Sequence, residues 1–210
     1  MLKAKACLFD FDGTLVDTME GFADIAGEII HKHHPEISFS EARAKYLETS
    51  GIPFFQQLEV ICPQDPTNQE KAAYFEETKK DGFFRAKFSQ EVKDTLNKLR
   101  KAGILVGVSS NNFQSLIEEF IKKSDLTFDI VLGYKDGFSK GKDHFDYILK
   151  NYSLTREDLV FVGDSLKDAE KGIENKVKFI GLTGTFSSAD FHKIRKDIKV
   201  INSLKELLTL

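Results

Sequence analysis

Residues 5–17 read KACLFDFDGTLVD, and this stretch decides the fold. Its apolar half, residues 6–9, is bounded by polar residues and is too short for a helix. It therefore predicts a strand that is buried on both faces, at the centre of a parallel sheet. Two carboxylates, Asp10 and Asp12, follow at once. Ligands of open α/β sheets bind beyond the carboxyl ends of the strands, so these carboxylates stand where chemistry is expected.

An Asp-Gly pair by itself is as typical of a plain turn as of a functional site. The strand before it favours a site, because two neighbouring carboxylates repel each other and their burial is costly without a compensating cation. A divalent metal would compensate them. Mg²⁺ in particular prefers a few carboxylates together with waters and substrate phosphate.

Composition limits the other classes of function. The 210 residues form one or two domains, and a hydrophobic fraction of 41% is enough for a packed core. The net charge of -3 predicts no attraction to nucleic acid or to an anionic membrane. There is neither a signal-peptide pattern nor an apolar run of ~20 residues, so we expect a cytoplasmic protein without a membrane span. The two cysteines suggest neither a disulfide framework nor a zinc site.

Between residues 18 and 85 the pattern is entirely helical. Helices are predicted over residues 18–34, 39–49, 54–61 and 67–80, with Ser38 and Thr67 opening two of them in capping boxes. We therefore expect a small helical domain of residues 18–85, inserted into an α/β domain of residues 1–17 and 86–210. Some charged groups of the insert are expected to be solvated: the histidines at 31, 33 and 34, and the cations Lys79, Lys80 and Arg85.

The rest of the chain alternates strands and helices. Strands are predicted over residues 104–108, 128–132, 159–162, 177–182 and 198–201, with helices between them and a last amphipathic helix over 203–208. This alternation predicts a doubly wound parallel sheet. Polar residues follow the strands at residues 109–112, at Lys140 and at the pair Asp164 and Asp168. The turn at Asn175 and Lys176 is expected to use Asn175 in the left-handed conformation, with mild strain at Lys176.

Residues 10–18, DFDGTLVDT, resemble motif I of the haloacid dehalogenase-like (HAD) superfamily. Three further matches follow in the same order: the apolar strand that ends in Ser109, then Lys140, then residues 163–168, GDSLKD. The resemblance spans nearly the whole chain and is greatest to the phosphoglycolate phosphatase-like and β-phosphoglucomutase-like members. It implies a Rossmannoid core with a helical C1 cap. The chain has Lys-Gly where the family commonly has Lys-Pro, and Lys142 stands as a second choice for the motif III lysine.

The resemblance also implies roles for these residues. Asp10 would be the nucleophile and Asp12 the general acid and base, with Lys140 as the third catalytic group. The phosphate would be held by Lys140 together with Ser109, Ser110 and Asn111. Mg²⁺ would be held by Asp10, Asp12 (through its backbone carbonyl), Asp164 and Asp168.

The activity that this resemblance implies is a Mg²⁺-dependent phosphatase that acts on a small phosphorylated metabolite through an aspartyl-phosphate. The alternatives are a sugar phosphomutase of the β-phosphoglucomutase kind and, more remotely, a non-catalytic binding module with the HAD fold. The expected partner is a small phosphate ester, and the expected assembly is a monomer or a homodimer.

Overall fold

A computed structural model describes residues 2–210 of the chain. Its contacts divide the chain into two compact units, a core unit of residues 2–16 with Phe88–Leu210 and a helical unit of Asp17–Lys87. The sequence predicted these divisions at residues 17/18 and 85/86, and the contacts place them at 16/17 and 87/88. The two units are described separately.

The core unit is built on a six-stranded parallel sheet with the order β3-β2-β1-β4-β5-β6. β1 lies between β2 and β4, and its four residues are fully buried, as the apolar run after Lys5 predicted. In chain order the strands are β1 (Ala6–Phe9), β2 (Leu105–Phe113), β3 (Ile130–Tyr134), β4 (Leu159–Gly163), β5 (Lys178–Leu182) and β6 (Lys199–Ile201).

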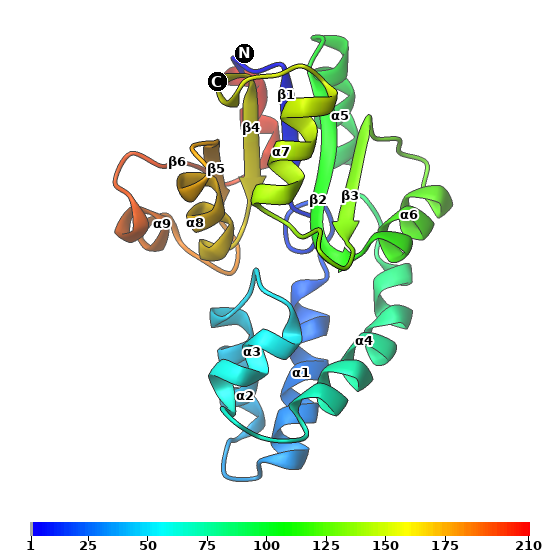
Figure 1. Ribbon diagram of the computed structural model, residues 1–210, viewed down its shortest axis with the longest axis vertical. Helices are drawn as coiled ribbons and strands as arrows, with labels where there is room; N and C mark the ends of the chain where they lie inside the picture. The colour runs from blue at the N-terminus through cyan, green and yellow to red at the C-terminus, as the bar shows by residue number, and fades with distance from the viewer. Residues whose placement is uncertain (1) are drawn as a thin grey trace. The chain divides into compact units, whose positions relative to one another are not determined.

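Helices cover both faces of the sheet, so the predicted doubly wound architecture is confirmed. α7, α8 and α9 pack on one face, and α5 and α6 on the other (Figure 1). The helices of this unit are α5 (Gln90–Lys101), α6 (Gln114–Lys123), α7 (Lys142–Asn151), α8 (Leu166–Glu174) and α9 (Ser188–Ile194), with short 3₁₀ segments at Arg156–Asp158 and Leu204–Thr209.

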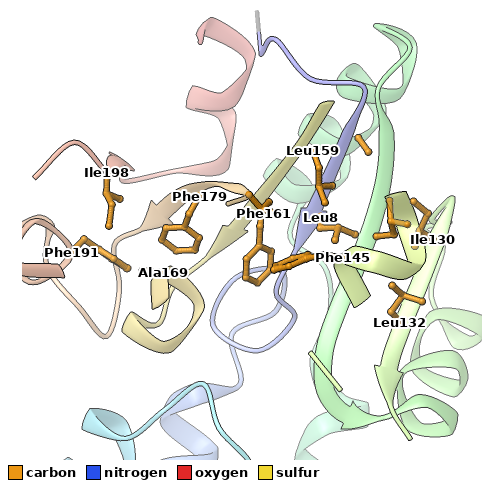
Figure 2. Close-up of a cluster of buried hydrophobic side chains, with 13 residues drawn as sticks. Leu8, Ile130, Leu132, Phe145, Leu159, Phe161, Ala169, Phe179, Phe191 and Ile198 are labelled. Carbon is orange, nitrogen blue, oxygen red and sulfur yellow. The ribbon is translucent and has the colours of Figure 1, made fainter. Parts of the chain in front are cut away.

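Phenylalanine side chains fill much of the core of a chain that has 19 phenylalanines and no tryptophan. Figure 2 shows Phe161 of β4 between Phe145 of α7 and Phe179 of β5. The ring centroids lie 5.3 Å and 5.8 Å apart, in the edge-to-face geometry that aromatic pairs prefer. This packing joins α7 to the central strands and so fixes the segment that precedes α7, which carries Lys140.

β2 departs from the sequence prediction. The strand was expected to end before Ser109, but it continues to Phe113 because it stays paired with β3, with an irregular register between the Ser109 and Phe113 pairs. The polar residues expected in a turn therefore lie on an irregular strand end. Gly133 makes room for it, since a Cβ on Gly133 would lie 2.8 Å from the carbonyl oxygen of Asn112.

Three smaller differences lie near the C-terminus. At the end of α8 the left-handed residue is Lys176, with φ 56°, and not Asn175, because the N–H of Val177 reaches back to Gly172 and places Lys176 where a glycine is usual. Helix α9, capped by Ser187, was not predicted. The expected last helix is a 3₁₀ segment, Leu204–Thr209.

The helical unit comprises α1 (Met19–His33), α2 (Phe39–Glu48), α3 (Phe54–Ile61) and α4 (Asn68–Arg85). Its centre is aromatic: the ring of Phe75 lies 4.3 Å from that of Phe54, 5.7 Å from that of Tyr46 and 6.0 Å from that of Phe22. The side chain of Ser38 accepts the N–H of Glu41, as its capping pattern predicted. No helix among residues 2–210 is both long and apolar enough to span a membrane.

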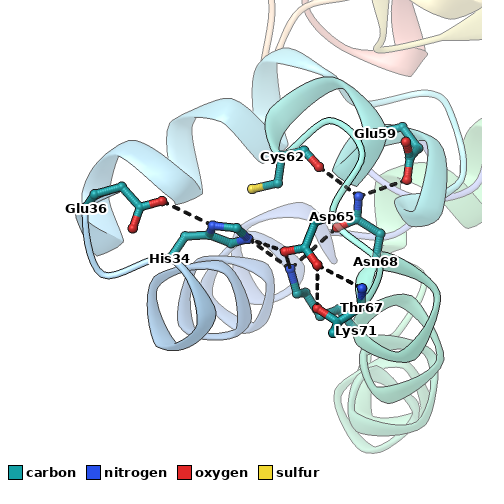
Figure 3. A network of polar contacts seen from close by, with 8 residues as sticks. All are labelled: His34, Glu36, Glu59, Cys62, Asp65, Thr67, Asn68 and Lys71. Carbon is teal, nitrogen blue, oxygen red and sulfur yellow. Dashed lines mark hydrogen bonds and ion pairs between the residues drawn. The ribbon is translucent and has the colours of Figure 1, made fainter.

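A polar network ties the end of α1 to the start of α4 (Figure 3). The side chain of Lys71 is 1% exposed, and its Nζ lies 2.6 Å from Oδ2 of Asp65. The ring of His34 lies between Asp65 and Glu36: its Nε2 is 2.7 Å from Oδ2 of Asp65, and its Nδ1 is 3.1 Å from Oε1 of Glu36. His34 is therefore not simply solvated, although His31 and His33 are exposed as expected. Thr67 does not cap α4 because its hydroxyl donates to Asp65.

α4 runs past the expected end at Lys80, because Phe83 on its last turns is fully buried. Lys79 also differs from the prediction. It is 5% exposed, and its Nζ lies 5.3 Å from the ring centroid of Phe75 and 5.6 Å from that of Phe22. Of the three cations expected to be solvated, only Arg85 is exposed, and Lys80 is half-buried.

Candidate active site

Asp10 is the first residue after β1 and stands at the carboxyl edge of the sheet, between the ends of β2 and β4. Its backbone N–H donates to Val162 of β4 at 2.8 Å, and the residue is 7% exposed. Burial raises the pKa of its carboxyl well above the usual value, and Asp168 and Asp164 raise it further, whereas Lys140 lowers it. A carboxylate in this position needs a cation.

Lys140 provides part of that charge. Its Nζ lies 2.6 Å from Oδ1 of Asp10 and 2.7 Å from Oδ1 of Asp168, and its side chain is 1% exposed. Burial disfavours the ammonium form, but the two carboxylates outweigh this and hold the pKa above its usual value. Lys142 is exposed and pairs with Asp146 at 2.7 Å. The structure thus brings Lys140, and not Lys142, to Asp10.

Three buried carboxylates, those of Asp10, Asp164 and Asp168, have oxygen atoms within 4.8 Å of one another. Thr14 donates its hydroxyl to Oδ1 of Asp164 at 3.0 Å. Burial, followed by the repulsion from Asp168, raises the pKa of Asp164 to about 7. With all three ionised, one lysine leaves an excess of two negative charges. A single divalent cation with oxygen ligands would balance this excess, so the residues present fit a magnesium site.

The Asp12 carboxylate is not part of this cluster. It is half-buried, and its Oδ2 accepts the side-chain N–H of Asn112 at 2.5 Å. Its side chain is thus turned toward the end of β2. The contact of the Asp12 backbone carbonyl with a metal, which the resemblance to the HAD superfamily implies, stays a prediction.

The serines at the end of β2 have different surroundings. Ser109 is fully buried, and its hydroxyl lies 2.8 Å from Nδ1 of His144 on α7. The hydroxyl of Ser110 accepts the backbone N–H of Asn112 at 3.1 Å. Asn111 is half-buried. Three of the four residues expected to hold phosphate therefore follow one another at the strand end, and the first of them, Ser109, also contacts α7 through His144.

Sequence reasoning missed four residues here. Thr14, Asn112 and His144 each bond a predicted site residue directly. Thr14 and Asn112 lie inside motifs that had been noted, whereas His144 gave no signal beyond its place four residues after Lys140. The fourth is Lys171 of α8, whose side chain packs against Gly141. Its pKa falls to about 8 because the side chain is buried and lies near the positive charge of Lys140.

Comparisons with known proteins agree with this fold. Residues 7–182 match the family described as haloacid dehalogenase-like hydrolase, and the chain belongs to that family. It is 24% identical over its whole length, and over 95% of the relative, to PpaX, a candidate pyrophosphatase of Caldanaerobacter subterraneus subsp. tengcongensis. It is 21% identical to phosphoglycolate phosphatase of Escherichia coli, with 97% of this chain and 91% of that protein covered.

Among solved structures, a haloacid dehalogenase-like family hydrolase from Streptococcus pneumoniae superposes with a TM-score of 0.82. The match covers 99% of this chain and 98% of the other at 20% identity. At this identity the likeness establishes the fold. The family expected from motif I is therefore confirmed over most of the chain.

Proposed function

We propose that this chain is a Mg²⁺-dependent phosphatase that hydrolyses a small phosphorylated metabolite through an aspartyl-phosphate. The observation that carries the proposal is the buried group of Asp10, Lys140, Asp164 and Asp168 at the ends of the central strands. The phosphoglycolate phosphatases among the relatives support the substrate class. A cytoplasmic location and a monomeric or homodimeric state remain predictions from the sequence.

In the first step a carboxylate oxygen of Asp10 attacks phosphorus, and the bond from phosphorus to the ester oxygen breaks. The departing oxygen keeps the bonding electron pair and takes a proton from the Asp12 carboxyl. Lys140 stays protonated beside Asp10 and offsets the negative charge that gathers on the transferring group. Ser109, Ser110, Asn111 and backbone N–H groups at the end of β2 would hold the remaining phosphate oxygens.

In the second step the Asp12 carboxylate takes a proton from a water molecule, whose oxygen attacks phosphorus. The bond between phosphorus and Asp10 then breaks, which releases phosphate and restores both aspartates. Mg²⁺ would be held by Asp10, the Asp12 carbonyl and Asp164, with Asp168 acting through water, and it supplies charge neutralisation of the phosphate when bound. The helical unit, in this proposal, is the cap that selects the substrate and excludes water.

The test is phosphate release from a panel of phosphorylated metabolites, measured with Mg²⁺ and with EDTA, for wild type and Asp10→Asn. Asp125→Asn serves as a matched control, because Asp125 is exposed and forms an ion pair with Lys93 at the surface. We expect turnover that needs Mg²⁺ and is lost in Asp10→Asn but kept in the control. Intact-mass measurement after acid quench should find a phosphorylated form of the wild type and of the control, but not of Asp10→Asn.

The alternatives give different results in the same experiments. A sugar phosphomutase would release little phosphate but would isomerise a sugar phosphate. A binding module would bind Mg²⁺ or an ester without turning it over. Turnover that is unchanged by EDTA or by Asp10→Asn would reject the proposal.

A further inference from the structure

The contact between Asn112 and Asp12 joins two segments that are 100 residues apart in the chain. The amide Nδ2 of Asn112 donates to Oδ2 of Asp12 at 2.5 Å. Asn112 is 5% exposed, while Asp12 is half-buried and stands at the edge of the site. A carboxylate only accepts hydrogen bonds when it is ionised, so the amide must present its NH₂ group to it. This is a charge-assisted contact, the stronger kind of hydrogen bond.

Both partners of this contact are held by their own backbones. The N–H of Asn112 donates to the Ser110 hydroxyl, and its carbonyl oxygen packs over Gly133 of β3. Asp12 lies in a closed turn in which Gly13, with φ 78°, donates its N–H to Val16. Because neither backbone needs to move, the amide is able to set the direction of the Asp12 carboxylate.

We propose that Asn112 is a positioning residue that aims the Asp12 carboxyl at the ester oxygen of the substrate. The inference rests on the proposed phosphatase function and extends it. Oδ2 is occupied by the amide N–H, so the proton passes to and from the other oxygen, Oδ1. As the bond from phosphorus to the ester oxygen breaks, Oδ1 gives its proton to that oxygen, and Asp12 becomes a carboxylate that the Asn112 amide already solvates.

A purely structural role for Asn112 predicts something different. If Asn112 only held the end of β2 in place, its loss would slow all substrates by a similar factor. If Asn112 aims the general acid, the effect of its loss on the rate depends on how much the leaving group needs a proton. Alkoxides are poor leaving groups and need the proton, whereas p-nitrophenolate leaves without one.

The experiment compares kcat/KM, which reports the steps up to release of the alcohol, for the best alkyl phosphate and for p-nitrophenyl phosphate. We expect Asn112→Ala to lower kcat/KM for the alkyl ester by about 10- to 100-fold and that for the aryl ester by about threefold or less. Asn112→Asp keeps the shape but replaces the donor with a second carboxylate. It should show the same dependence on the leaving group, at least as strongly.

Gln114→Ala is the matched control. Gln114 lies two residues further on and ties the end of β2 to β3 by accepting the N–H of Gly133 and donating to Val131. Its loss should lower the thermal midpoint without favouring one leaving group. Equal losses for both esters in Asn112→Ala, or normal alkyl turnover in Asn112→Asp, would overturn the positioning role. If the wild type hydrolyses neither ester, the proposed function itself fails, and this inference fails with it.

Discussion

The ammonium of Lys140 lies 2.7 Å from Oδ1 of Asp168, so the lysine beside the candidate nucleophile is also bound from the first turn of α8. Asp168 is fully buried and leans over Gly163, the last residue of β4. A Cβ on Gly163 would lie 2.6 Å from Oδ2 of Asp168, closer than real side chains approach. The position of Lys140 therefore depends on Asp168, whose own position requires that residue 163 has no side chain.

The first prediction concerns this glycine. Gly163→Ala should push Asp168 away, lower the free energy of unfolding by about 1–3 kcal/mol, and reduce turnover through the displaced Lys140. Denaturant unfolding and phosphate release measure the two effects. Gly184→Ala is the control, since no described residue other than its two chain neighbours has an atom within 4 Å of its Cβ position. Equal stability of the two variants would refute the close contact.

The second prediction concerns the charge of the cluster. The pKa of Asp164 is raised from 3.8 to about 7, so the folded state holds a proton that the unfolded state releases. The contribution of Asp164 to the free energy of unfolding therefore falls as the pH rises from about 4 to 7, and it stays low at pH 8. Without metal at pH 8, Asp164→Asn should unfold at a higher temperature than wild type, by about 2–4 °C for each kcal/mol relieved.

Magnesium should reverse this order. An ion that binds only the folded state increases the free energy of unfolding as its concentration rises above its Kd. The melting temperature of wild type should therefore rise with Mg²⁺ concentration, and that of Asp164→Asn should not. Thermal scans with EDTA and with a Mg²⁺ series measure both responses. A variant that melts lower than wild type in EDTA, yet still responds to Mg²⁺, would contradict this prediction.

The third prediction concerns Thr14, which orients Asp164 through a hydrogen bond of 3.0 Å. Thr14→Val keeps the shape but removes the donor. Mutation of a residue that hydrogen-bonds a metal ligand typically lowers metal affinity by about 10- to 100-fold. We therefore expect the Mg²⁺ concentration for half-maximal activity to rise by about 10-fold. Thr14→Ser should restore it. An unchanged Mg²⁺ requirement in Thr14→Val would show that Asp164 does not depend on this bond.

The fourth prediction is a pH dependence that arises from His144. Burial, followed by the charge of Lys140, lowers its pKa from 6.5 to about 4, so the folded state keeps the ring neutral. The unfolded chain binds a proton below pH 6.5, and stability is lost as the pH falls toward 4. The full difference is about 3 kcal/mol. Denaturant unfolding at pH 7 and pH 4.5 should show a smaller loss in His144→Gln; equal losses would disprove the assignment.

The fifth prediction tests the buried lysine of the helical unit. Lys79→Ala removes an ammonium held over Phe22 and Phe75, together with its packed stem, and should lower the free energy of unfolding by about 2 kcal/mol. Lys80→Ala, one residue on, should change it by less than about 0.5 kcal/mol because Lys80 makes a surface pair with Glu77. Denaturant unfolding of both variants checks the contrast. Similar values would mean that Lys79 contributes little by packing.

Much of the core unit was predictable because its signals are local. The apolar run before Asp10 predicted the central strand, and the same reasoning placed Asp164 at the end of another strand. Parallel strands with carboxyl ends at one edge then bring such residues together. The choice between Lys140 and Lys142 rested on the family resemblance, and the structure supports it with the contact to Asp10.

Other features depend on partners that are far apart in the chain. No sequence pattern near Lys79 predicts that its ammonium lies over aromatic rings from α1 and α4. β2 extends past Ser109 because β3 continues to pair with it, and Lys176 becomes left-handed because of a backbone bond to Gly172. Local propensity describes a residue's own preference, and tertiary contacts overrode it at each of these places.

The sequence by itself indicated the family, the six strands with most of the helices between them, and Asp10, Lys140, Asp164 and Asp168 as residues that meet at the sheet edge. The strands and helices follow from hydrophobic periodicity, whereas the family and the roles of its residues follow from the resemblance to the motifs of the superfamily. Only the tertiary structure decided which groups hold those residues: Thr14 on Asp164, His144 on Ser109, and Asn112 on Asp12. A hydrogen bond of about 3 Å between residues 35 to 150 positions apart depends on how the sheet and its helices pack, and no local pattern encodes it.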